Sequence, residues 1–274
     1  MTVGILYICT NKYTVAWKDF YLTGEKYLFP SVTKKYFVFS DMSEVYGAEN
    51  NPDIVAIAVE HREWPYNTLL RFEIFDQHKA LFEGCDYLLF YNANTVFTAE
   101  IQPEEILPTA EENYLVALSN QDVLFMKPDE YAYERNPLST ACIPYGQGKD
   151  YYRGGFNGGR TPEFLQLIKT CKEQTEIDLK NNLIALWHDE SHLNKYLLDR
   201  PVKTLTSVYG KAGEWRKPKN AKVVFIDKRK IFDVYEFKKM KQERISLSRF
   251  IKKRWRRLLS FLQSVKFASP AKNP

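Results

Sequence analysis

The sequence predicts an α/β fold with a mixed, mostly parallel sheet flanked by helices. Two observations lead to this prediction: short apolar runs alternate with amphipathic stretches, and polar residues follow the runs directly. With 274 residues, of which 45% are hydrophobic and 27% charged, the chain is long enough to bury a sizeable core. The sequence is therefore that of a globular protein rather than a disordered or fibrous one.

The predicted strands of the first half are near-continuous apolar runs, which is typical of strands buried on both faces. They are Val3–Cys9, Tyr36–Asp41, Asp53–Val59 and Asp86–Tyr91. Ligands of such sheets bind beyond the carboxyl ends of the strands. We therefore expect the loops after Cys9, Asp41 and Tyr91 to converge on one site.

Periodicity predicts the remaining elements. Helices are expected over about Val15–Phe29, Tyr66–Phe82, Thr161–Thr175 and Asp189–Leu198, and further strands over Glu111–Leu118, Val123–Met126 and Val223–Asp227. Tyr133–Pro144 is a predicted loop. Tyr151–Gly159 is strand-like and holds four glycines, which indicate either a close approach to the backbone or a bulged strand.

Residues 187–198 form the most distinctive stretch, with the sequence WHDESHLNKYLL. Asp189 and Glu190 fall in the first turn of the predicted helix, where the dipole and free N–H groups favour carboxylates. Leu193, Tyr196 and Leu197 should face the core. This arrangement fixes two carboxylates on a rigid element, as a catalytic site requires. The alternative is an ordinary helix start.

A second polar motif, Asn92-Ala93-Asn94, directly follows an apolar strand. Divalent cations such as Mg²⁺ and Mn²⁺ prefer carboxylates, and neutral amides are poor substitutes. The motif is therefore either a modified ligand site or an asparagine-rich turn that closes the strand.

Cysteine spacing and hydropathy exclude several protein classes. Cys9, Cys85, Cys142 and Cys171 lie far apart, so no zinc site or disulfide framework is expected. The first residues lack a signal-peptide pattern. No apolar run approaches the roughly 18 residues that span a bilayer. We expect reduced cysteines and no integral membrane segment.

The last part of the chain is strongly basic. Residues 236–274 contain 12 Lys and Arg against two Glu, so residues 1–235 carry a balance of −5 within the total of +5. Ser246–Phe267 is a predicted C-terminal amphipathic helix with a basic face opposite Trp, Phe and Leu, which suits an anionic membrane surface. A solvated helix, or one packed on the domain, is the alternative. Nucleic acid is disfavoured because the body is acidic and no recognition fold is evident.

With these residues in view, the chain resembles glycosyltransferase family 6, which includes the histo-blood group A and B transferases, the α-1,3-galactosyltransferase and bacterial relatives. The motifs that carry the resemblance are Trp64–Phe72, Asp86–Asn94, Tyr133–Pro144, Tyr151–Gly159 and Trp187–Leu198. It extends from Ile8 to about Lys230. It implies an A-type glycosyltransferase fold, with a catalytic domain over residues 1–235 and a separate tail over 236–274.

The resemblance also implies the reaction, a retaining transfer of galactose or N-acetylgalactosamine (GalNAc) from its UDP conjugate to the 3-hydroxyl of a β-galactoside, often 2-fucosylated. By motif position, Glu190 is the catalytic carboxylate, acting as nucleophile or as stabiliser of an oxocarbenium-like transition state. Asp189 and His188 would hold donor hydroxyls, and Trp187 would form a wall of the acceptor site.

Other positions correspond to the nucleotide site of the family. Tyr13 and the backbone of Ile8-Cys9-Thr10 match the uridine cradle, Arg71 the arginine beside the metal motif, and Lys228 the lysine that contacts the diphosphate. Asn92-Ala93-Asn94 stands where many relatives carry Asp-x-Asp and resembles the bacterial members that work without a metal. No cofactor is therefore expected, and Lys228, Arg71 and Arg153 are candidates to compensate the charge of leaving UDP.

Substrate choice depends on fewer residues. Arg153-Gly154-Gly155 matches the donor-selecting segment, and Gly155 leaves room for an N-acetyl group, which favours UDP-GalNAc over the alternative UDP-galactose. On the acceptor side, Ser119-Asn120 replaces a His-Pro pair and Ala132 replaces a polar contact. A glycan-binding protein without activity is the alternative of another class. The predicted location is cytoplasmic, on the inner face of the cytoplasmic membrane.

Overall fold

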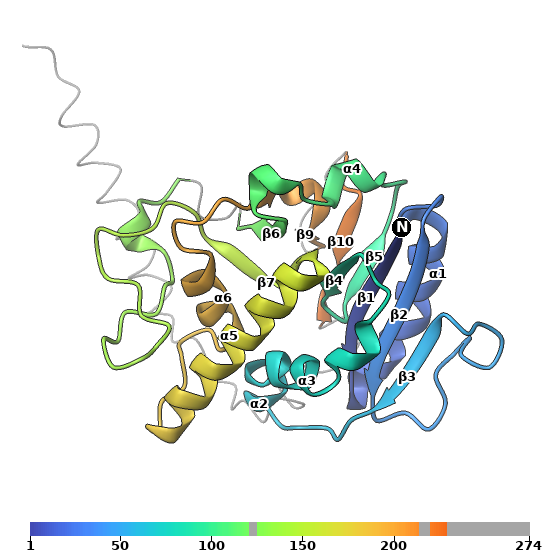
Figure 1. Cartoon of the computed structure of the whole chain (residues 1–274), viewed down its shortest axis with the longest axis horizontal. Helices are drawn as coiled ribbons and strands as arrows, with labels where there is room; N and C mark the ends of the chain where they lie inside the picture. The colour runs from blue at the N-terminus through green and yellow to red at the C-terminus, as the bar shows by residue number, and fades with distance from the viewer. Residues whose placement is uncertain (121–124, 214–219, 229–274) are drawn as a thin grey trace, which may run out of the picture. The chain divides into compact units, whose positions relative to one another are not determined.

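A computed structural model describes residues 1–120, 125–213 and 220–228, and it confirms the α/β prediction (Figure 1). Within these residues seven strands form one sheet in the order β3-β2-β1-β4-β7-β6-β8. The strands are β1 (Thr2–Cys9), β2 (Thr33–Ser40), β3 (Ile54–Ala58), β4 (Tyr87–Tyr91), β6 (Leu115–Ser119), β7 (Tyr152–Arg160) and β8 (Lys203–Leu205). Only β7 pairs antiparallel with its neighbours in the described sheet, so the sheet is mixed but mostly parallel.

A smaller sheet lies beside the main one and contains β5 (Thr95–Phe97), β10 (Val223–Phe225) and β9 (Lys211–Ala212). Strand β10 pairs antiparallel with β5 and parallel with β9. Of these strands the sequence predicted only β10, which lies within the apolar run Val223–Ile226, whereas β5 and β9 lie in no such run. The small sheet brings the residues after β10 next to Asn94.

Helices cover both faces of the main sheet. In Figure 1, α3 (Arg71–Gln77), α5 (Thr161–Lys180) and α6 (Asp189–Leu197) lie in front of it, and α1 (Trp17–Tyr27) lies behind. Alternation along β1 supplies both sides of the core: Val3, Ile5 and Tyr7 join one apolar cluster and Leu6 joins the other. Two short helices, α2 (Tyr66–Leu69) and α4 (Pro103–Ile106), complete the layers. None of the described helices is long and apolar enough to cross a membrane.

The prediction of one continuous helix over Tyr66–Phe82 is wrong. The segment consists of α2, α3 and a 3-10 turn over Lys79–Phe82. At His78 the ring nitrogen Nδ1 lies 2.8 Å from the carbonyl of Ile74, while the backbone N–H donates to Phe75 instead. The side chain thus takes the carbonyl that the next helical bond would use, which ends the helix.

The predicted strand over Glu111–Leu118 begins later than expected, at Leu115. The carboxylate of Glu112 accepts hydrogen bonds from the backbone N–H and the hydroxyl of Thr109, both at 2.7 Å. This capping box closes a 3-10 turn where the pattern predicted extended chain.

Other boundaries differ by a few residues, and some predictions fall outside the described part. Helix α5 continues five residues beyond the predicted end at Thr175, and a 3-10 turn over Asn11–Ala16 precedes α1. Of the predicted strand Val123–Met126, the last two residues form a turn and a bend, and the first two lie outside the described residues. The boundary at residue 235 and the amphipathic helix over 246–267 also lie outside them and remain predictions.

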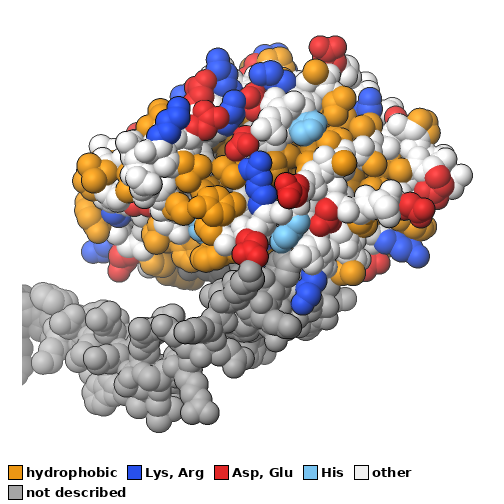
Figure 2. Space-filling model, turned by 90° about the horizontal axis from the view of Figure 1, so that it is seen from below, with side chains coloured by type: hydrophobic (Ala, Val, Ile, Leu, Met, Phe, Trp, Pro, Cys, Tyr) orange, Lys and Arg blue, Asp and Glu red, His pale blue; other side chains and the backbone are white. Residues whose placement is uncertain are grey.

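The edge of the sheet at which the parallel strands end carries the polar loops (Figure 2). Charged side chains and His gather near the middle of this face, between apolar areas. The backbone N–H of Asn11, after β1, donates to both carboxylate oxygens of Asp41, after β2, at 2.9 Å each. Because β7 is antiparallel, its first residues also reach this edge. The loops therefore converge, as the sequence predicted.

Candidate active site

A buried ion pair joins α3 to the start of α6. The Arg71 Nη1 atom lies 2.6 Å from Oδ2 of Asp189, and the same nitrogen donates to the carbonyl of Gly154 at 2.6 Å. The two side chains are only 6% and 7% exposed. The guanidinium of Arg71 also stacks on the ring of Phe90, 4.0 Å from its centroid. Three segments far apart in the sequence thus meet at one arginine.

The predicted catalytic Glu190 is held through both carboxylate oxygens. The hydroxyl of Tyr151 donates to Oε1 at 2.6 Å, and the N–H of Gly154 donates to Oε2 at 2.7 Å. Helix α6 begins at Asp189, as predicted, and its residues Leu193 and Leu197 are buried in the core. The carboxylate therefore has a fixed orientation on a rigid element.

Burial controls the charge of these groups. It raises the pKa of Asp189 to about 6, an effect that Arg71 opposes, so this carboxyl remains ionised at pH 7. It also raises the pKa of Glu190, against the hydrogen bonds from Gly154 and Tyr151. A carboxylate with a raised pKa and two fixed donors suits either a nucleophile or an electrostatic stabiliser.

A bulge in β7 explains why Gly154 reaches this cluster. Leu118 of β6 pairs with Arg153, whereas the preceding Ala117 pairs with Asn157, so the residues between them leave the ladder with β6. A β-carbon at Gly154 would lie 3.1 Å from the β-carbon of Glu190 and 3.2 Å from Oδ2 of Asp189. A larger residue here would displace both carboxylates. Gly154 therefore lets the backbone come close to Asp189 and Glu190, and it also lies in a bulge. Both predicted reasons for a glycine in this strand apply to it.

A cavity of about 380 Å³ opens next to Glu190. Six of the predicted site residues line it: Asn92, Asn94, Arg153, Gly155, Trp187 and Glu190. The sequence gave no role to two further lining residues, Tyr151 and Phe225. Arg71 and Asp189 are not among the lining residues and lie in the buried cluster instead.

The predicted nucleotide residues form a second group beside the cavity. The hydroxyl of Thr10 lies 2.9 Å from Nδ1 of His61, and the carbonyl of Cys9, which follows Ile8 at the end of β1, accepts a 2.7 Å hydrogen bond from Ser40. The Lys228 Nζ atom lies 5.3 Å from the centroid of the Tyr13 ring. Two segments more than two hundred residues apart in the sequence thus meet where the sequence predicted uridine and diphosphate contacts.

The asparagine motif is engaged in hydrogen bonds of its own. Asn92 Nδ2 donates to Oδ1 of Asn94 at 3.1 Å, and Asn94 Nδ2 donates to the carbonyl of Ile226 at 2.6 Å. The amide oxygen of Asn94 thus accepts one hydrogen bond, and neither side chain carries charge. Neutral amides are poorer ligands for Mg²⁺ and Mn²⁺ than carboxylates. In the described ranges no group of three or more His, Cys, Asp or Glu side chains is placed to hold a metal ion.

Comparison with known proteins shows which family contains a chain with these residues. A model of glycosyltransferase family 6 matches residues 1–234. The chain belongs to glycosyltransferase family 6. It is 36% identical over 228 residues to the O-antigen biosynthesis glycosyltransferase WbnI of Escherichia coli, a match that covers 83% of this chain and 95% of the relative. Membership in family 6 makes the chain a hexosyltransferase with a nucleotide-sugar donor and a glycan acceptor.

Animal relatives in family 6 are longer. The histo-blood group ABO system transferase 1 of Rattus norvegicus is 31% identical over 216 residues, which cover 76% of this chain and 60% of the relative. The globoside alpha-1,3-N-acetylgalactosaminyltransferase 1 of Homo sapiens is 26% identical over 216 residues with the same two shares. The chain spans about three fifths of the length of these two relatives.

The residues predicted for the acceptor side are more exposed than the buried Arg71–Asp189 pair. Trp187 is 51% exposed, and the ring of the neighbouring His188 meets the Trp64 ring edge-on with centroids 5.3 Å apart. Ser119 pairs with Tyr152 in the sheet, and the next residue, Asn120, lines the cavity. Asn120 accepts two hydrogen bonds from Arg153, at 3.1 and 2.9 Å.

Two buried carboxylates that the sequence did not single out hold the loop behind this wall. Glu134 accepts hydrogen bonds from the N–H groups of Leu186 at 2.6 Å and Asn136 at 2.7 Å, which fixes the chain just before Trp187. Asp178 accepts from Ser139 and Thr140 at 2.5 and 2.7 Å. Glu134 lies within the family motif Tyr133–Pro144, and that was the available signal.

His192 lies fully buried on α6 near this loop. Its Nε2 atom is 3.9 Å from Asp178, and neither ring nitrogen has a hydrogen-bond partner among the described residues. Burial lowers the pKa of His192 to about 4, although Asp178 and Glu134 act in the opposite direction. The imidazole is therefore neutral at physiological pH.

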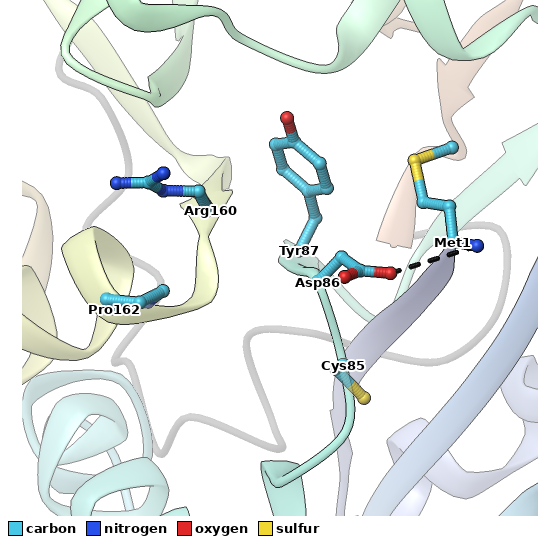
Figure 3. A pocket seen from close by; sticks show the side chains of 6 residues that line it. All are labelled: Met1, Cys85, Asp86, Tyr87, Arg160 and Pro162. Atoms are coloured by element: carbon cyan, nitrogen blue, oxygen red, sulfur yellow. Dashed lines mark ion pairs between the residues drawn. The ribbon is translucent and has the colours of Figure 1, made fainter.

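A larger hollow of about 740 Å³ lies at the opposite edge of the sheet (Figure 3). Its lining includes Asp86, Tyr87 and Arg160, and the amino group of Met1 lies 3.9 Å from Asp86. None of the predicted site residues lines it. Volume alone therefore does not identify the site in this enzyme.

Proposed function

We propose that the chain is a retaining α-1,3-N-acetylgalactosaminyltransferase that works without a metal. It would transfer GalNAc from UDP-GalNAc to the 3-hydroxyl of a β-galactoside, which gives a linkage like that of blood group A. The observation that carries this proposal is the Glu190 carboxylate, held by Tyr151 and Gly154 beside a cavity large enough for a hexose. It follows that Glu190 is the residue whose loss should abolish transfer.

In the proposed reaction the bond between the anomeric carbon and UDP breaks, and its electron pair leaves with the diphosphate. Glu190 either attacks the anomeric carbon, forming a bond that the acceptor oxygen later displaces, or stabilises its positive charge. The acceptor oxygen bonds on the face that UDP left, and its hydroxyl proton passes to the departing diphosphate. Arg71 keeps Asp189 ionised and fixes Gly154, so its main contribution is to position these groups. The double-displacement and front-face routes use the same residue.

Without a metal, basic side chains and amides would stabilise the negative charge of leaving UDP. Leaving UDP develops negative charge, which preorganised cations stabilise. Lys228 lies beside Tyr13, the predicted uridine contact, and Arg153 lines the cavity. The hydrogen-bonded amides of Asn92 and Asn94 support a metal-independent site because their chemistry disfavours Mg²⁺ or Mn²⁺.

GalNAc is the proposed donor because Gly155 places no side chain on the cavity wall. The human relative is named as an alpha-1,3-N-acetylgalactosaminyltransferase, which supports the same choice. UDP-galactose is the second candidate. The bacterial relative, named for O-antigen biosynthesis, supports a cell-surface glycan as acceptor. Binding of residues 246–267 to an anionic membrane at the cytoplasmic face would bring the enzyme to a lipid-linked acceptor.

The test offers UDP-GalNAc and UDP-galactose separately to lactose and 2'-fucosyllactose and measures the product and its anomeric configuration. We expect an α-linked GalNAc product, with a rate lowered roughly 10³-fold or more in Glu190→Gln. Glu176→Gln, an exposed carboxylate on α5, is the matched control and should retain full activity. If wild type and Glu190→Gln bind the glycan equally and neither transfers a sugar from either donor, the chain is a glycan-binding protein instead. If both transfer at the same rate, Glu190 is not the catalytic residue.

A further inference from the structure

The ring of Phe225 lies between two glycines at one wall of the cavity. A β-carbon on Gly155 would come within 3.3 Å of Cζ of this ring, and one on Gly210 within 3.1 Å of Cε2. A side chain at either position would push the ring away. Gly155 therefore makes room for Phe225, and Gly210 makes room first for Leu118, the nearer side chain, and then for Phe225. The Phe225 side chain is half-buried and lines the same cavity as Glu190.

Phe225 adds an aromatic ring to the cavity wall beside Gly155 and Asn92. It is the last residue of β10, and the next residue, Ile226, exchanges hydrogen bonds with Asn94 at 2.8 and 2.6 Å. The ring is thus tied to the asparagine side of the cavity. The other large apolar residue of the lining, Trp187, belongs to the segment before α6.

Both donor sugars can place the C–H groups of one pyranose face against an aromatic wall, so that contact does not distinguish them. GalNAc carries a 2-acetamido group where galactose has a 2-hydroxyl, and the methyl of this group is apolar. A methyl group against an aromatic ring is favourable, and one apolar carbon in a pocket changes specificity by about 10- to 200-fold. The wall next to Gly155 therefore suits GalNAc better than galactose.

We propose that Phe225 is a donor-specificity residue whose ring receives the acetamido methyl of UDP-GalNAc. The inference rests on the proposed function, since it requires the donor sugar to occupy this cavity. This role and a purely structural role of Phe225 predict different effects on the preference between the two donors. Phe225 also packs on the apolar core, and loss of core packing would weaken both donors equally, whereas loss of a methyl contact weakens only one.

The experiment compares wild type, Phe225→Ala and the conservative Phe225→Leu, each with UDP-GalNAc and UDP-galactose and one acceptor. We expect the ratio of the two kcat/KM values, GalNAc over galactose, to fall about 10-fold in Phe225→Ala and by less in Phe225→Leu. Tyr27→Ala is the matched control, because Tyr27 is a half-buried aromatic on the same core cluster and does not line the cavity. Its ratio should equal that of wild type.

The ratio of dissociation constants for the two UDP-sugars, measured by calorimetry, provides the same test without turnover. A ratio within twofold of wild type in both Phe225 variants would overturn the assignment. A rise would also overturn it, because the ring would then obstruct the acetamido group. If wild type binds neither UDP-sugar, the proposed function fails together with this inference. If it binds and transfers both with an unchanged ratio in the variants, only this inference fails.

Discussion

The buried cluster of Arg71 and Asp189 and the cavity wall around Trp187 differ in how far their side chains are exposed. Arg71 and Asp189 are buried and 2.6 Å apart, and each would leave an unpaired charge in the core if the other were removed. Trp187 is half exposed and is held from behind through the Glu134 bond to Leu186. Substitutions in the cluster should therefore affect folding and transfer together, whereas substitutions in the wall should affect acceptor binding with a smaller loss of stability.

The largest expected effect is on the cluster side. Arg71→Met leaves Asp189 buried without its cation, which should lower the free energy of unfolding by about 3–5 kcal/mol and abolish transfer. Urea unfolding and a transfer assay measure the two effects. Arg62→Met is the matched control, since Arg62 is 39% exposed and lies 3.4 Å from Glu73, a pair worth about 0–1 kcal/mol. Equal losses in the two variants would contradict the contrast.

The next effect concerns His192, which lies between the cluster and the loop. Its pKa is lowered to about 4, so the unfolded chain binds the proton more readily. The stability that neutral His192 provides is complete above pH 6.5, its unfolded value, and should fall by about 3 kcal/mol as the pH drops to 4.

His192→Phe removes the group that titrates and keeps an aromatic ring in the same place. The difference in unfolding free energy between wild type and His192→Phe, followed from pH 7 to pH 4, isolates the histidine, because Asp189 titrates in both proteins. A difference that does not change with pH would show that His192 is protonated in the folded chain.

A smaller effect is expected at Glu134. In Glu134→Gln one of the two N–H groups, of Leu186 or Asn136, meets an NH₂ group instead of an acceptor, which costs about 1–3 kcal/mol. The KM for the acceptor should rise several-fold, while the Kd for UDP stays at its wild-type value. An equal rise in both constants would mean that the wall and the nucleotide side are not independent.

The smallest effect on stability is expected at Trp187. Because its side chain is half exposed, Trp187→Ala should change the free energy of unfolding by about 0.5 kcal/mol or less. We expect the acceptor KM to rise about 10-fold, with hydrolysis of the donor unchanged. Kinetics at saturating donor measure the first quantity and UDP release without acceptor the second. An unchanged acceptor KM would remove Trp187 from the acceptor site.

Much of the fold could be predicted from the sequence because its signals are local. The apolar runs of β1 to β4 and the acidic start of α6 at Asp189 are each contained within a few neighbouring residues. Strand β5 has only two apolar residues in a row and therefore lacks such a signal. The break at His78 depends on one side-chain contact with Ile74, which no pattern of hydrophobicity reveals.

The site was predictable only in part, because its contacts join distant segments. The resemblance gave Glu190 and Arg71, but the bonds from Tyr151 and Gly154 to Glu190 depend on β7 running antiparallel with a bulge. The contact between Phe225 and Gly155 likewise requires β10 to lie beside the carboxyl edge of the main sheet. Such contacts follow from topology, which the motifs alone do not determine.

Chelation tests the central claim most directly, namely that this site replaces a metal with amides and basic side chains. GalNAc transfer by the full chain would be measured in excess EDTA and again with added Mn²⁺. We expect equal rates under the two conditions, since Asn92 and Asn94 already bond to each other and Asn94 bonds to Ile226. Transfer that appears only when Mn²⁺ is present would contradict the claim.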